Sequence, residues 1–187
     1  TLELGGKNPN IIMSDADLDI AIPGVIDGMR YTRQGQACTA GSRVYIQEKI
    51  YDKVLEGVVN KLKNLKMGNA LDEKSDIGAI ISEEQLNRTL HYMKIAKENS
   101  STKVLHGGNQ KKSGDYKQGF FYEPTLLSGV PVESPVCQEE IFGPVACAIP
   151  FKSFDEVLES ANNTPFGLSA VLWTQNLSRA LQFVEEI

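Results

Sequence analysis

Short apolar runs alternate with amphipathic helical patterns along nearly the whole chain. The runs at 10–13 and 145–151 are almost continuously apolar, and 43–47 carries a third run of the same kind. A strand that is apolar on both sides needs cover on both faces, which a parallel sheet obtains from helices packed above and below it. We therefore predict an α/β protein with a layered α/β/α arrangement and a largely parallel sheet.

The segments between these runs carry helix signals. The acidic cluster 15–19 suits a helix start, because carboxylates cap the free amides and meet the positive end of the helix dipole. Pro23 lies inside the apolar spacing that follows, which predicts a later start or a kink in a helix that runs towards Gly35. The stretch 51–65 is amphipathic, with apolar residues on one stripe and lysines on the other side.

Two more helices, over 82–99 and 153–161, begin with a serine followed three residues later by Gln or Glu, the spacing of a capping box. A last helix is expected to begin at Asn176. Further extended segments are predicted over 103–106, 120–127 and 168–174. The stretch 120–127 contains Pro124, which lacks an N–H group and limits that stretch to an edge or irregular strand.

Composition narrows the class of protein. Of the 187 residues, 41% are hydrophobic and 23% are charged, which is typical of one good-sized globular domain. The net charge of -5 argues against nucleic acid or an anionic membrane as a partner, and we find no signal peptide or transmembrane run. Three cysteines without Cys-x-x-Cys spacing disfavour a disulfide framework or a metal site and favour a reducing, cytoplasmic location.

The stretch 34–43 surrounds Cys38 with small residues and leads directly into an apolar run. This pattern predicts a thiol held in a loop at the start of a strand, within reach of a substrate. A thiolate in such a place is a candidate nucleophile. The alternative is a buried structural cysteine, which is the commoner situation for an arbitrary cysteine.

Two acidic groups are further candidates. Glu3 stands between two leucines and before two glycines, and partial desolvation there would raise its pKa towards that of a general base. Its alternative is a carboxylate satisfied by backbone amides of the glycine turn. In the cluster 139–144, a carboxylate could accept hydrogen bonds from ribose hydroxyls while Phe142 packs on a flat ring. The alternative is an ordinary loop, and no Gly-x-Gly-x-x-Gly fingerprint is present.

Four segments together resemble the signature segments of the NAD(P)-dependent aldehyde dehydrogenase superfamily, in the family's order and at compatible separations. The segments are Glu3-Leu4-Gly5-Gly6-Lys7, Gly35-Gln36-Ala37-Cys38, Glu139-Glu140-Ile141-Phe142-Gly143-Pro144 and Asn163-Thr164-Pro165-Phe166-Gly167-Leu168. The resemblance covers essentially the whole chain, and it favours the nucleophile hypothesis for Cys38.

The resemblance implies a role for each of four residues. Cys38 is the nucleophile that forms a thiohemiacetal and then a thioester with a small-molecule aldehyde, and its backbone amide helps to hold the oxyanion. Glu3 is the base that activates water for hydrolysis. Glu140 binds the nicotinamide ribose of NAD or NADP, and Phe142 packs near it. The segment 163–168 is given a structural role.

The resemblance also implies that much of the parent enzyme lies outside this chain. In the family, the dinucleotide-binding domain and the asparagine of the oxyanion hole lie mainly before the Glu-Leu-Gly-Gly-Lys segment, and an oligomerisation strand lies beyond the region that ends here. Residues 1–187 are therefore expected to form a single, incomplete catalytic domain, with little or no turnover by itself, from a parent that is a homo-oligomer. Cys137 and Cys147 match no family function and are expected to be packing residues.

Two other readings stay open. The first is a cysteine acyl-transfer or hydrolytic enzyme that needs no dinucleotide, with His91 or His106 activating Cys38. No motif places either histidine near the thiol. The second is a non-catalytic binding or structural protein, against which the presence of both Glu3 and Cys38 argues.

Overall fold

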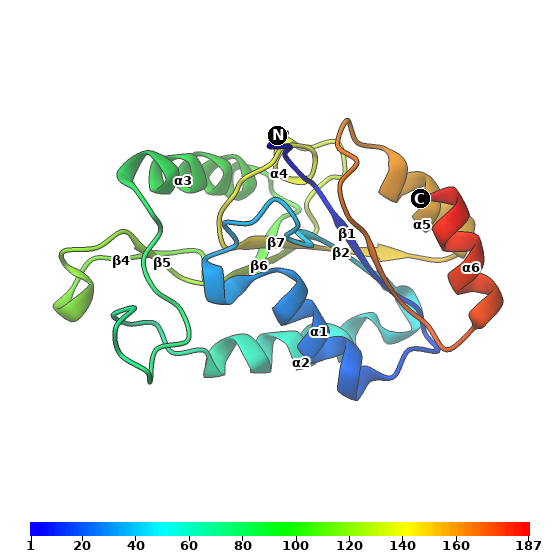
Figure 1. The fold of residues 1–187 in the computed structure, drawn as a ribbon, viewed down its shortest axis with the longest axis horizontal. Helices are drawn as coiled ribbons and strands as arrows, with labels where there is room; N and C mark the ends of the chain where they lie inside the picture. Colours follow the sequence, from blue (N-terminus) through cyan, green and yellow to red (C-terminus); the bar gives the residue numbers. More distant parts are fainter.

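The computed structural model describes residues 1–187 and is built around a six-stranded sheet (Figure 1). The strand order across the sheet is β3 (Lys103–His106), β6 (Thr125–Ser128), β7 (Val145–Phe151), β2 (Arg43–Gln47), β1 (Pro9–Ile12) and β8 (Val171–Trp173). All neighbouring pairs are parallel except β3 and β6, which are antiparallel. A separate antiparallel pair joins β4 (Gln110–Lys111) to β5 (Phe121–Tyr122).

Helices cover both faces of the sheet, as predicted. Two helices lie on one face, α1 (Leu18–Gly28) and α2 (Tyr51–Asn64). The other face carries α3 (Glu83–Glu98), α4 (Pro135–Gln138), α5 (Phe154–Asn162) and α6 (Leu177–Glu186). Short 3-10 helices add η1 (Tyr31–Arg33), η2 (Glu48–Ile50) and η3 (Gly114–Tyr116).

The continuous apolar character of the strands follows from this double cover. Ile11 and Ile12 are both fully buried, yet Ile11 packs among the side chains under α3 and α5 while Ile12 packs under α1 and α2. Successive side chains of a strand point to opposite faces, so a strand between two helix layers has no side on which a polar residue meets water.

The first predicted helix is shorter than expected. Asp17 caps α1, so the helix begins at Leu18 within the acidic cluster, with Asp19 in its first turn. Pro23 lies inside the helix and does not delay its start. The helix ends at Gly28 and does not continue to Gly35, because the left-handed backbone of Arg30, with φ 58°, breaks the helical path.

The two capping boxes have different outcomes. Ser153 and Glu156 at the start of α5 form both reciprocal bonds, so this prediction is confirmed. Ser82 accepts a hydrogen bond from the Gln85 amide at the start of α3, but the Gln85 side chain bonds elsewhere.

The extended stretch 120–127 is divided in two at Pro124, into β5 and β6. Of the two predicted alternatives, the edge strand is wrong for β6, which lies between β3 and β7 inside the sheet, and the interruption at Pro124 agrees with the irregular strand. The ladder of β6 begins at Thr125, after the proline, so the missing N–H group falls outside it. The expected strand over 168–174 is shorter than predicted and forms only β8. No helix has the length and apolar character that a membrane span requires.

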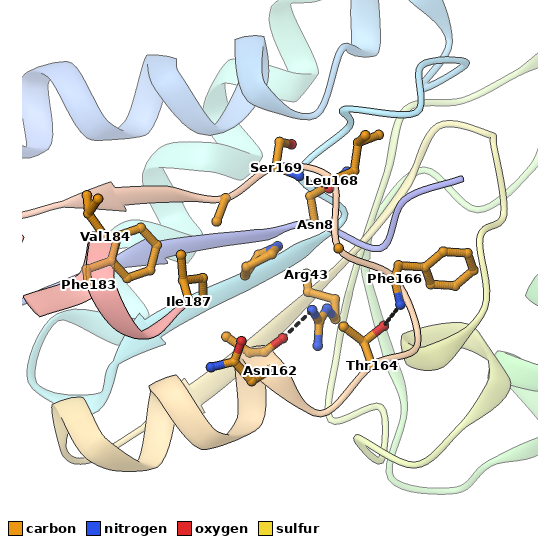
Figure 2. Close-up of a pocket in the computed structure, with 14 residues that line it drawn as sticks. Asn8, Arg43, Asn162, Thr164, Phe166, Leu168, Ser169, Phe183, Val184 and Ile187 are labelled. Atoms are coloured by element: carbon orange, nitrogen blue, oxygen red, sulfur yellow. Dashed lines mark hydrogen bonds between the residues drawn. The ribbon is translucent and has the colours of Figure 1, made fainter. Parts of the chain in front are cut away.

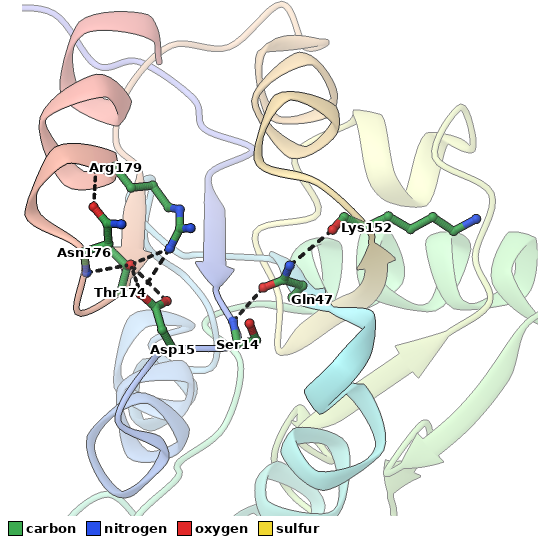
Figure 3. A network of polar contacts seen from close by, with 7 residues as sticks. All are labelled: Ser14, Asp15, Gln47, Lys152, Thr174, Asn176 and Arg179. Atoms are coloured by element: carbon green, nitrogen blue, oxygen red, sulfur yellow. Dashed lines mark hydrogen bonds and ion pairs between the residues drawn. The ribbon is translucent and has the colours of Figure 1, made fainter.

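Polar contacts tie the loops that follow β1, β7 and β8 to one another and to the end of β2 (Figure 3). Asp15 forms an ion pair of 3.1 Å with Arg179 and accepts a hydrogen bond from Thr174. The Gln47 side chain accepts from the Ser14 amide and donates to the carbonyl oxygen of Lys152. These contacts fix the carboxyl-terminal edge of the sheet.

Candidate active site

Four loop segments that carry the predicted site residues meet at the opposite, amino-terminal edge of the sheet. They are 1–8, 34–42, 139–144 and 163–170, and they precede β1, β2, β7 and β8 respectively. These strands are neighbours and run in the same direction, so the segments before them converge. Ligands of open α/β sheets commonly bind at the carboxyl ends of the strands, and this site therefore departs from that rule.

Cys38 lies in the irregular segment 34–42, called the Cys38 loop below. Gln34 and Gly35 adopt left-handed backbone conformations, with φ of 56° and 64°, and turn the chain after η1. The amide of Gly41 donates to the carbonyl oxygen of Gly28 at 2.9 Å, which ties the loop to the end of α1. Cys38 is half-buried and forms no disulfide, and its predicted position in a loop before a strand is confirmed.

The buried Asn8 side chain joins three of the converging segments. Its Nδ2 donates to the carbonyl oxygens of Cys38 at 2.7 Å and Ala40 at 3.0 Å. Its Oδ1 accepts from the Ser169 amide at 3.0 Å. Sequence reasoning missed Asn8, and the signal that marks it is a polar side chain placed directly before a buried strand.

Gly6 allows the first segment to approach Cys38 and Glu140. A Cβ on Gly6 would lie 2.1 Å from the carbonyl oxygen of Cys38, so no side chain fits there. The Gly6 amide donates to Oε1 of Glu140 at 2.9 Å. The second carboxylate oxygen, Oε2, accepts no hydrogen bond from the protein and lies beside Gly5. The structure thus brings together the segments of Cys38 and Glu140 around the glycine pair.

Phe142 has a φ of 55°, a left-handed conformation that is rare for a bulky residue. We call residues 140–143 the Phe142 turn. The Nε2 of Gln85 donates to the carbonyl oxygens of Ile141 at 2.9 Å and Phe142 at 2.8 Å. A left-handed non-glycine residue costs of order 1–3 kcal/mol, and such strain persists where neighbouring contacts hold it. Gln85 supplies two of those contacts.

One face of α3 supports the whole segment before β7. Gln85, Arg88 and Tyr92 are spaced three and four residues apart, so they share that face. Arg88 donates to the carbonyl oxygen of Glu140, and the Tyr92 hydroxyl donates to Oε2 of Glu139 at 2.7 Å. Burial raises the pKa of Tyr92, and the hydrogen bond to Glu139 raises it further.

The expectation that Glu3 is partly desolvated is wrong. Glu3 is exposed, in an extended segment before β1. Its neighbours Leu2 and Leu4 are themselves 81% and 55% exposed, so they give the carboxylate no apolar cover. Glu3 lies three residues before Gly6, on the segment that touches Cys38.

Two buried cations stabilise this edge of the sheet. The Arg43 guanidinium donates to the carbonyl oxygens of Lys7 and Ala161, both at 2.8 Å. Ala161 lies in the last turn of α5, where the negative end of the helix dipole favours a cation. The Lys7 ammonium donates to the carbonyl oxygen of Val136 at 2.7 Å, and burial lowers the pKa of Lys7.

A cavity of about 440 Å³ lies between the loop before β8 and α6 (Figure 2). Arg43, Phe166 and Phe183 are among its lining residues, and Cys38 is not. The polar groups of Arg43 and Thr164 are already hydrogen-bonded within the protein. The space enclosed beside the Cys38 loop is far smaller, about 10 Å³. The larger cavity therefore does not mark the position of the candidate nucleophile.

Comparison with known proteins identifies the class to which this fold and site belong. The family model described as "Aldehyde dehydrogenase family" matches residues 1–187. The chain therefore belongs to the aldehyde dehydrogenase family. It is 40% identical over 186 residues to the α-ketoglutaric semialdehyde dehydrogenase of Bacillus subtilis, covering 100% of this chain and 38% of that protein.

Solved structures of the family share the fold. A betaine aldehyde dehydrogenase from Staphylococcus aureus, crystallised with NAD+, is 34% identical with a TM-score of 0.95, covering 100% of this chain and 36% of that one. An aldehyde dehydrogenase from Bacillus cereus, also an NAD+ complex, is 40% identical with a TM-score of 0.93, covering 100% of this chain and 37% of that one. The predicted fold class and the family resemblance are confirmed, and the chain spans little more than a third of the length of these relatives.

Proposed function

We propose that this chain is the catalytic-domain part of a longer NAD(P)-dependent enzyme that oxidises an aldehyde to a carboxylic acid. The observation that carries the proposal is the junction at Gly6, where the Cys38 loop and the Glu140 carboxylate meet on one glycine turn. Residues 1–187 form a single, incomplete catalytic domain of a cytoplasmic, homo-oligomeric parent. The match to family members that are more than twice as long supports this assignment.

The residues present fit the nicotinamide half of the cofactor. The Gly6 amide holds one oxygen of Glu140 in place, which leaves Oε2 free to accept a hydrogen bond from a ribose hydroxyl. Phe142 is half-buried beside it and offers an aromatic surface. When bound, NAD+ or NADP+ supplies the hydride acceptor for the oxidation.

The remaining chemistry belongs to side chains of this chain. The Cys38 thiolate attacks the aldehyde carbon, a carbon–sulfur bond forms, and the carbonyl electrons move to the oxygen, where the backbone amide of Cys38 donates to it. After oxidation, Cys38 holds the acyl group as a thioester. Glu3 takes a proton from a water molecule that attacks the thioester carbon, and the carbon–sulfur bond breaks to release the acid and the thiolate. The exposed position of Glu3 gives it ready access to water.

The hydrolase alternative gains no support from the positions of the histidines. His91 is exposed on α3, with its ring against Tyr92. His106 lies in β3, three strand positions from β2, which corresponds to roughly 14 Å across the sheet. Neither histidine forms a hydrogen bond with the Cys38 loop.

The decisive experiment adds a panel of aldehydes and NAD+ or NADP+ to the full-length protein and follows the reduced cofactor. The variant C38A should form no reduced cofactor. The variant E3Q should give an initial burst followed by slow turnover, because acylation proceeds and deacylation lacks its base. Glu48 is an exposed glutamate far along the chain, and E48Q serves as the control with unchanged kinetics.

Three outcomes would count against the proposal. Undiminished turnover by E3Q would remove Glu3 as the base. Ester hydrolysis without any dinucleotide, together with no aldehyde oxidation, would support the hydrolase alternative. Activity that survives alkylation of Cys38 would show that Cys38 is not the nucleophile. Separately, we expect the isolated residues 1–187 to show little or no turnover.

A further inference from the structure

We propose that Asn8 is a positioning residue that holds the Cys38 loop in its working geometry, an inference that rests on the proposed function of Cys38. Asn8 is 3% exposed, so its hydrogen bonds do not compete with bulk water. Its amide uses both hydrogens on the Cys38 loop and its oxygen on the Ser169 amide. Both donors and the acceptor oxygen of this side chain therefore fix one loop against another.

The part of the Cys38 loop around the thiol, residues 37–42, depends on Asn8 more than on any other side chain. Among the side-chain hydrogen bonds of the structure, the two from Asn8 are the only ones that reach residues 37–42. The bond to the Cys38 carbonyl fixes the peptide plane that follows the nucleophile, and the bond to Ala40 fixes the plane two residues later. Since the thiol turns with its backbone, loss of these bonds releases it from a defined direction towards a substrate.

Asn10 provides a matched control two residues further along. Asn8 and Asn10 point to the same side of the extended chain, and Asn10 is fully buried. The Oδ1 of Asn10 accepts from the Trp173 indole at 2.8 Å, while its Nδ2 makes no hydrogen bond. A change from Asn to Asp thus removes both loop contacts at Asn8 but removes no hydrogen bond at Asn10.

The test compares N8D with N10D in the full-length protein. For N8D, we expect amide hydrogen exchange in 37–42 to become about tenfold faster or more, because two buried hydrogen bonds are replaced by carboxylate oxygens that face carbonyl oxygens. We expect kcat/KM for the aldehyde to fall about tenfold or more, with KM for the dinucleotide changed by less than about twofold. N10D buries the same charge beside Gly41 but removes no hydrogen bond to the loop, so we expect both quantities to change less than in N8D.

A second pair, N8A and N10A, covers the case in which a buried carboxylate prevents folding. Cys137 and Cys147 are 0% and 1% exposed, so their resistance to alkylation reports that each variant remains folded. Unchanged exchange in 37–42 in a folded Asn8 variant would overturn the proposal. Equal effects at Asn8 and Asn10, or failure of both Asn8 variants to fold, would also overturn it, because either result indicates a general structural role.

Failure of the proposed function is a distinct result. If the unmodified full-length protein oxidises no aldehyde, the function assigned to Cys38 is wrong whatever the exchange experiment shows. If the unmodified protein oxidises aldehydes and N8D has the same kcat/KM, the proposed function is supported and the positioning role of Asn8 is wrong.

Discussion

A Cβ atom on Gly35 would lie 2.2 Å from the carbonyl oxygen of Gly143, so the Cys38 loop and the Phe142 turn are in direct backbone contact. This is closer than any side chain allows, and the φ of 64° at Gly35 is also unfavourable for other residues. The contact connects the loop of the candidate nucleophile with the segment that carries Glu140.

Replacement of Gly35 by alanine should therefore destabilise the protein by about 3 kcal/mol or more. Gly114 has a similar φ of 59° but nothing within 4 Å of the position of a Cβ. Its replacement by alanine therefore measures only the cost of a left-handed backbone conformation, without a steric clash. We expect G114A to cost about 1 kcal/mol. Urea unfolding of both variants measures the difference, and equal losses would show that the contact with Gly143 relaxes without cost.

The variant Q85E should weaken binding of the dinucleotide about tenfold in the full-length protein. Glutamate has nearly the same shape as glutamine but places carboxylate oxygens against the carbonyl oxygens of Ile141 and Phe142, to which Gln85 now donates. The Phe142 turn loses its support, and with it the placement of Glu140. Calorimetric titration with NAD+ measures the effect. Q118E makes the same charge change at an exposed position and should bind normally.

The variant R43K should lose about 3 kcal/mol of unfolding free energy, although it keeps the charge. Lysine cannot reproduce the separate hydrogen bonds that the guanidinium makes with Lys7, Tyr45 and Ala161, so buried acceptors are left unpaired. The matched change R33K lies at an exposed position of η1 and should cost less than about 0.5 kcal/mol. A small loss in R43K would mean that water replaces the guanidinium.

The protein should lose stability in alkaline solution. Burial raises the pKa of Tyr31, Tyr45 and Tyr122 above their ordinary value of about 10, so these phenols stay neutral in the folded state. The unfolded chain releases their protons near pH 10, so it binds fewer protons than the folded state above that pH. The contribution of these groups is fully present below about pH 10 and decreases as the pH rises further.

Urea unfolding between about pH 8 and pH 11, together with the ultraviolet absorbance of phenolate, measures this loss. A free energy of unfolding that stays constant up to about pH 11 would contradict the prediction. Phenolate absorbance of these tyrosines near pH 10 in the folded protein would also contradict the prediction, because it would show that the buried tyrosines have ordinary pKa values.

The layered fold follows from local sequence patterns, namely apolar runs and helix-capping residues. The run 145–151 forms β7 with the predicted bounds, and Ser153 caps α5 in the predicted capping box. Such features depend on neighbouring residues alone, through side-chain periodicity and the satisfaction of free helix amides. Pro124 shows the limit of this reasoning, since only the order of strands decided that β6 lies inside the sheet.

The sequence by itself determined the composition of the site: Cys38 in an accessible loop, and acidic and aromatic residues in a turn before a strand. The tertiary structure decided how these parts meet. Parallel alignment of four strands brings their preceding loops together, and Asn8 and Gln85 hold those loops through bonds to backbone carbonyls. Every residue has a backbone carbonyl group, so the type of the accepting residue does not indicate such a hydrogen bond, and no sequence pattern predicts it. Exposure of Glu3 was likewise decided by the absence of any element packed on Leu2 and Leu4.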